Sequence, residues 1–115
     1  MTTVNAQTVS RNVVVDAIYR AVRATDYINK KWKAEYFDHS QWVSLYSIKS
    51  GMEVVFPVII KIDKGVVELR SEAGDWAFFT HRPEDGPWSE EITEVLASVM
   101  EDELTRFISR YWAKK

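Results

Sequence analysis

The chain contains no cysteine. It can therefore form neither a disulfide framework nor a thiolate-held zinc or iron–sulfur site, and it has no cysteine nucleophile. Because no sign of an oxidising compartment is present, we expect a cytoplasmic protein. The first twelve residues are polar, unlike a signal peptide, and the longest apolar run covers only residues 54–60. The sequence predicts neither export nor a membrane span.

Motifs for catalysis and for nucleotide binding are also missing. There is no glycine-rich phosphate loop, no Gly-x-Ser-x-Gly elbow and no His-Glu-x-x-His pair, and the whole chain has only four glycines. We therefore expect a protein that is not an enzyme and that holds neither a cofactor nor a metal ion.

The size and composition favour one small soluble domain. With 115 residues, 46% of them apolar, the chain can bury one core but not two, and a net charge of −2 is far from the excess typical of disordered chains. No repeat, low-complexity tract or linker divides it. We therefore treat residues 1–115 as a single domain, with residues 1–9 as a flexible N-terminal arm.

Two stretches have the three- and four-residue apolar spacing of an α-helix. The first predicts a helix over residues 11–35, capped by Ser10. The second predicts a helix that begins after Ser89 and continues for nearly six turns, with Glu90 and Glu91 near the positive end of its dipole.

Alternation with a period of two predicts four strands between these helices. The clearest covers residues 52–62, whose even-numbered side chains are all apolar and should face the core. Pro57 indicates an edge position or a bulge within it, and residues 63–65 predict a three-residue hairpin. The other strands are expected near 42–48, 66–70 and 76–80. The order α-β-β-β-β-α indicates an α+β fold, in which an antiparallel sheet packs one face against both long helices.

The two histidines each have carboxylates close by in sequence. His39 adjoins Asp38, and His81 precedes Glu84 and Asp85. Such pairs can bind a metal or move a proton, and a small hydrolase is therefore a third hypothesis. Because both rings are expected in loops, where they would be solvated or cap backbone groups, we assign them no catalytic or metal-binding role.

The charge is distributed unevenly along the chain. Residues 1–50 carry a net charge of +3, whereas residues 72–103 hold ten acidic side chains and one basic one. A solvated helix face would explain this, but an acidic surface that binds a basic partner would explain it as well. For that surface we predict a set of carboxylates around one aromatic anchor: Glu84, Asp85, Trp88, Glu90, Glu91 and Glu94.

A basic set on the first predicted helix supports an alternative, which is contact with phosphates. Its members are Arg11, Arg20, Arg23, Lys30, Lys31 and Lys33. The same helix also carries acidic residues, and no aromatic nucleic-acid motif accompanies the cations. A nucleic-acid-binding module is therefore the second hypothesis.

Together these features predict a non-catalytic cytoplasmic protein-interaction domain, such as a small inhibitor, an immunity-type partner or a chaperone-like adaptor. The expected partner is a protein with a basic surface, and the sequence leaves a homodimer open.

Overall fold

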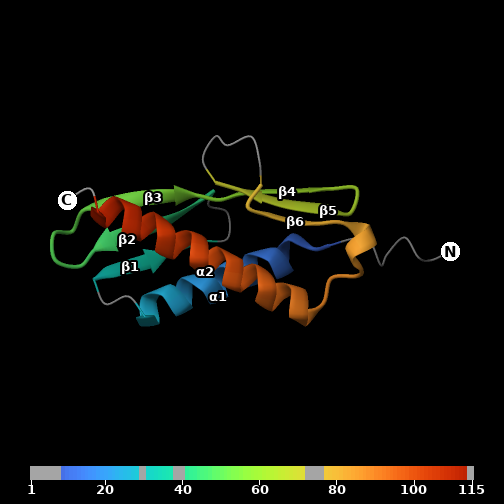
Figure 1. Ribbon diagram of the computed structural model, residues 1–115, viewed down its shortest axis with the longest axis horizontal. Helices are drawn as coiled ribbons and strands as arrows, with labels where there is room; N and C mark the ends of the chain where they lie inside the picture. Colours follow the sequence, from blue (N-terminus) through green and yellow to red (C-terminus); the bar gives the residue numbers. More distant parts are fainter. Residues whose placement is uncertain (1–8, 29–30, 38–40, 72–76, 114–115) are drawn as a thin grey trace.

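The computed structural model describes residues 9–28, 31–37, 41–71 and 77–113. Helix α1 (Arg11–Ile28) comes first and helix α2 (Glu90–Ala113) last (Figure 1). Between them lie six strands and a short 3₁₀ helix: β1 (Trp32–Glu35), β2 (Trp42–Ser47), β3 (Glu53–Pro57), β4 (Ile59–Asp63), β5 (Val66–Arg70), β6 (Phe79–His81) and η2 (Pro83–Asp85). All strand pairs are antiparallel, in two sheets ordered β1-β2-β3 and β4-β5-β6. The α+β class is therefore confirmed, although the strands form two sheets rather than one.

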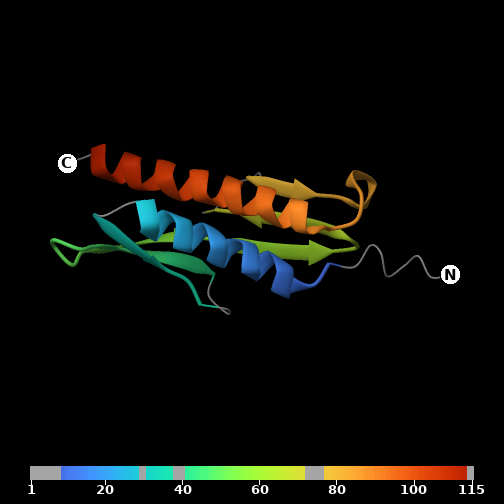
Figure 2. The same ribbon diagram turned by 90° about the horizontal axis from the view of Figure 1, so that it is seen from below.

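Both helices lie side by side and cover one face of the sheets (Figures 1 and 2). Every fourth residue of α2 from Leu96 to Ile108 is buried, as are Val14 and Ile18 of α1. The strands bury alternate side chains against them, because successive residues of a strand point to opposite faces. The buried strand residues include Trp32, Ala34, Val43, Leu45, Phe56, Val67 and Leu69.

The predicted starts of both helices are confirmed. The Ser10 hydroxyl accepts a hydrogen bond from the Asn12 amide at 3.1 Å, and the Ser89 hydroxyl accepts one from the Ile92 amide at 3.4 Å. These bonds satisfy amides of the first turn that have no partner within the helix.

The predicted extent of the first helix is wrong. Helix α1 ends at Ile28, and residues 32–35 form strand β1, which pairs with β2. The sequence is ambiguous at Trp32. Its spacing of four residues from Ile28 is typical of a helix, whereas its spacing of two residues from Ala34 is typical of a strand. The buried Trp32, Ala34 and Tyr36 alternate with the exposed Lys33 and the half-buried Glu35, which is the period of a strand.

The predicted strand over residues 52–62 is divided at Val58, which brings the number of strands to six. Pro57 ends β3, the Val58 amide still donates to the Gln41 carbonyl at 2.8 Å in the register of β2 and β3, and from Ile59 onward the chain pairs with β5 instead. β3 is an edge strand of its sheet, as the proline predicts. The even-numbered side chains nevertheless stay on the core side across the break, so the predicted core face is confirmed at Phe56 and Val58.

The hairpin between β4 and β5 has a two-residue turn rather than three residues. Lys64 and Gly65 both have positive φ, 53° and 81°, and Asp63 pairs directly with Val66. Two consecutive positive φ values give the turn a twist that matches that of the strands.

Candidate functional site

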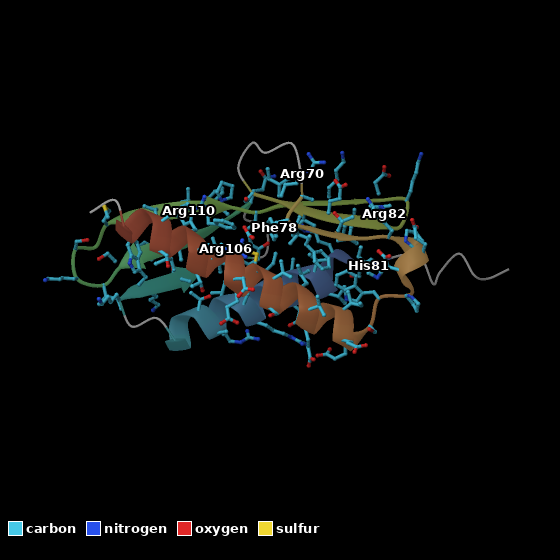
Figure 3. The ribbon with its side chains drawn as sticks, viewed as in Figure 1. Arg70, Phe78, His81, Arg82, Arg106 and Arg110 are labelled. Carbon is cyan, nitrogen blue, oxygen red and sulfur yellow. The ribbon has the colours of Figure 1, made fainter. Side chains whose placement is uncertain are left out.

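The predicted acidic surface lies on η2 and on the first half of α2. Glu84, Asp85, Glu91 and Glu94 are all exposed there. The Asp85 carboxylate accepts a hydrogen bond from the Arg82 amide at 2.9 Å, which fixes the turn of η2. From Ser89 to Thr105 the helix carries six acidic residues and no basic one, and the acidic stretch ends only at Arg106 (Figure 3).

Glu90 differs from the other carboxylates because it binds a cation. The Arg20 guanidinium of α1 donates to both of its carboxylate oxygens, one of them at 3.2 Å, and also contacts Asp16 at 2.9 Å. The hydrogen bond from Arg20 holds the pKa of Glu90 below its ordinary value. Because the pKa of Glu90 is lowered in the folded state, its ion pair with Arg20 stabilises the fold at neutral pH. This stabilisation is lost as the pH falls through the folded-state pKa. Glu90 therefore joins the two helices and is not free for a partner.

Trp88, the predicted aromatic anchor, is half-buried against the core. Its indole N–H donates to the Thr93 hydroxyl at 2.8 Å. Its ring makes edge-on contacts with Phe79 and His81, with centroids 6.1 and 5.3 Å away. These contacts leave little of the ring for a partner.

Val95 supplies an exposed apolar side chain at the place where Trp88 was expected to act. It is 48% exposed and lies one turn after Glu91 and beside Glu94. Val95 belongs to the three- and four-residue apolar spacing that predicts this helix, and that spacing places it on the buried side. Because each helical residue is rotated by about 100° from the last, the burial of Leu96 turns Val95 toward solvent.

His81 lies in strand β6 rather than in a loop, and the expectation that its ring is solvated or caps the backbone is wrong. It is only 5% exposed, on the side of β6 that faces the start of α2 (Figure 3). Within the described residues, neither ring nitrogen has a hydrogen-bond partner. The nearby carboxylates of Glu84 and Asp85 are exposed. His39 lies outside the described residues. No three metal-ligating side chains come together in the part of the chain that the structure describes.

Replacing His81 by leucine is expected to stabilise the protein by roughly 1–2 kcal/mol. An imidazole always has a polar nitrogen to satisfy, and a buried polar group without a partner costs about that much. His81→Gln keeps a polar group at the same place and serves as the matched control, for which no gain is expected. Urea denaturation measures both variants. A leucine variant less stable than the parent would show that the ring is satisfied by water or by packing.

The residues predicted to form a basic face on the first helix do not all lie on that helix. Since α1 ends at Ile28, Lys31 and Lys33 lie beyond it, Lys33 in β1, and Arg20 is bound by two carboxylates. Arg11 and Arg23 are twelve residues apart, which places them about 18 Å apart along the helix and about 120° around it. Lys30 lies outside the described residues.

A second surface is the face of the sheets turned away from the helices, which the sequence already indicates as apolar in the middle, at Val55, Pro57 and Ile59. We call it the outer face. The pairing places Trp42 opposite Pro57, with Val55 and Ile59 two residues to either side along the β3–β4 edge. Phe37 follows β1 by two residues. Trp42, Val55, Ile59 and Phe37 are between 41% and 64% exposed. We call these four residues, together with Pro57, the apolar row.

Comparison with protein families, with curated proteins and with solved structures finds no match for this chain. Neither described helix is long and apolar enough to cross a membrane.

Proposed function

We propose that this chain is a non-catalytic protein-interaction domain that binds a basic surface of a partner protein. Its binding surface consists of Glu84, Asp85, Glu91 and Glu94 around the exposed Val95. We place this activity in the cytoplasm, in keeping with the lack of cysteine.

One observation carries the proposal: two carboxylates without a cation in the described residues, Glu91 and Glu94, flank an exposed apolar side chain, Val95, on the same helix. Among the described residues, Glu84, Glu91 and Glu94 have no ion pair, whereas neighbouring Glu90 has one. Charges of one sign guide the encounter with a partner of opposite charge. An apolar side chain that becomes desolvated at the centre of the contact then contributes to affinity.

The same charges argue against nucleic acid as the partner. Phosphates would be repelled by the acidic surface, and the cations of α1 do not gather on one face. The burial of His81 disfavours the hydrolase hypothesis, because its ring is enclosed beside Trp88, where a substrate cannot reach it.

Glu91→Lys combined with Glu94→Lys is expected to slow association with the partner about tenfold at low salt, with little effect at high salt. This pair leaves the Glu90–Arg20 contact between the helices in place. Val95→Arg is expected to act mainly on the dissociation rate. The partner is first isolated on the immobilised protein and identified, and rates are then measured with the purified partner at several salt concentrations.

Glu101→Lys combined with Asp102→Lys is the control, because it changes the net charge equally on α2, more than one turn beyond Val95 and away from the outer face of the sheets. Circular dichroism checks that each variant is folded, since lysines near the start of α2 oppose its dipole. If the control variant associates with the partner as slowly as the α2 variant, the effect comes from net charge alone. Unchanged rates in the folded α2 variant would overturn the proposal.

A further inference from the structure

The outer face has its apolar residues in the middle and charged residues at both ends. Beyond Val55, the end formed by β1, β2 and β3 presents Lys33, Glu35 and Glu53. Beyond Ile59, the end formed by β4 and β5 presents charged residues of both signs: Lys61, Asp63, Lys64, Glu68 and Arg70. Arg70 binds Glu68 at 3.2 Å. This leaves Lys61 and Lys64 against Asp63 at the second end. With Lys49 of the turn after β2 counted at the first end, as Lys64 is at the second, the first end is neutral and the second carries one net positive charge.

The two carboxylates of the first end, Glu35 and Glu53, lie close together. Tyr46, between β1 and β3, is paired with both Lys33 and Glu53. Burial raises the pKa of Tyr46, and the charges of Glu53 and Glu35 raise it further. Both carboxylates therefore act on the same region of the outer face.

The β3–β4 edge is symmetric about Pro57 in its chemistry. Two residues away on either side stand the exposed apolar Val55 and Ile59, and four residues away stand Glu53 and Lys61, whose charges are opposite. The odd-numbered residues from 53 to 63 all lie on the outer face, because the even-numbered ones keep to the core side through the break at Val58. Such a surface is complementary to a copy of itself turned by 180°.

We propose that a second copy of this chain covers the apolar row, so that the protein forms a two-fold dimer through its outer faces. The axis lies between the two faces and crosses the strands at Pro57. It places Val55 of one copy against Ile59 of the other, and Glu53 against Lys61 of the other. The acidic surface of α2 stays outside this contact, and the dimer is therefore independent of the proposed binding of a basic partner.

The lengths of the two halves suit this arrangement. From Pro57 to Gly51, at the turn between β2 and β3, is six residues, and from Pro57 to Lys64, at the turn between β4 and β5, is seven. At about 3.3 Å per residue these are roughly 20 and 23 Å. The axis thus brings the first turn of one copy, with its exposed Ile48, to the second turn of the other. There the outer face has a shallow hollow of about 240 Å³ lined by Lys61, Asp63, Lys64, Val66 and Glu68.

The first test is the mass of the protein in solution. Light scattering and sedimentation over a wide concentration range are expected to give twice the chain mass of 13.4 kDa. Val55→Arg is expected to weaken self-association by a factor on the order of 100 or more, because a charge is buried at both symmetric positions. Val95→Arg is the matched control: Val95 is as exposed as Val55, 48% against 47%, but lies on α2. It should leave the dimer intact.

A charge exchange then tests the orientation. One variant combines Glu35→Lys with Glu53→Lys, and the other combines Lys61→Glu with Lys64→Glu. Each places like charges together at both ends of its own dimer and is expected to remain monomeric. An equal mixture of the two restores opposite charges at both ends, so it should form a mixed dimer.

A parent protein that stays monomeric at about 100 μM would overturn the proposal, as would a folded Val55→Arg variant that dimerises like the parent. Failure of the mixed dimer to form would rule out the proposed axis. A loss of partner binding in the Val95→Arg variant, with its dimer intact, bears on the proposed function alone.

Discussion

Phe56→Ala is expected to lower the free energy of unfolding by about 3–5 kcal/mol, the usual cost of removing a large aromatic ring from a packed core. Phe56 is 2% exposed and pairs with Val43 across the sheet. Its ring lies 5.2 Å from the ring of Phe107 in α2 and 6.4 Å from that of Phe78. The substitution therefore opens a cavity at a contact between a sheet and a helix, where neither can easily move in to fill it.

Urea denaturation at one fixed protein concentration measures this effect. Val55→Ala is the control, because Val55 is the preceding residue of β3 and points to the outer face. It removes apolar atoms from the same strand without opening a cavity in the core, so we expect a cost below about 1 kcal/mol. Similar costs for the two variants would mean that the side chains of β3 are not divided between a core face and an outer face.

The division of β3 and β4 into two faces could be predicted because it depends on sequence alone. A strand that buries one face needs an apolar residue at every second position, and residues 52–62 have that pattern. The break at Val58 could not be predicted, because it is the point at which the chain exchanges its partner strand β2 for β5, and the choice of partner strand is made only in the folded chain. The same holds for the end of α1, where Trp32 suits both periods and its pairing with Ser47 decides between them.

The candidate site was predicted only in part, for a similar reason. The order of residues in the sequence shows that α2 begins with carboxylates, and these carboxylates are exposed as expected. Which of them is free depends on Arg20, which lies seventy residues before Glu90 and reaches it only in the folded chain. The exposure of Val95 likewise depends on how α2 is rotated against the core. The apolar middle of the outer face follows from the odd-numbered residues of the predicted strand, since Val55, Pro57 and Ile59 are apolar on the side opposite the core.

Trp88→Ala is expected to lower the free energy of unfolding by roughly 3 kcal/mol, in contrast to the binding role that the sequence suggests for this residue. The substitution removes the hydrogen bond to Thr93 in the first turn of α2 and the ring contacts with Phe79 and His81. Trp88→Phe keeps an aromatic ring and loses the hydrogen bond, which is worth about 1 kcal/mol.

Trp42→Ala is the matched control for this experiment, because Trp42 is 47% exposed on the outer face. At a concentration where the protein is monomeric, Trp42→Ala should lower the free energy of unfolding by less than about 1 kcal/mol. At higher concentration it should weaken the dimer. Urea denaturation and near-ultraviolet circular dichroism follow both variants. If Trp88→Ala unfolds at the same urea concentration as the parent but releases the partner faster, the indole is a binding anchor after all. In that case the contacts with Thr93 and Phe79 must open when the partner binds, and the start of α2 would rearrange in the complex.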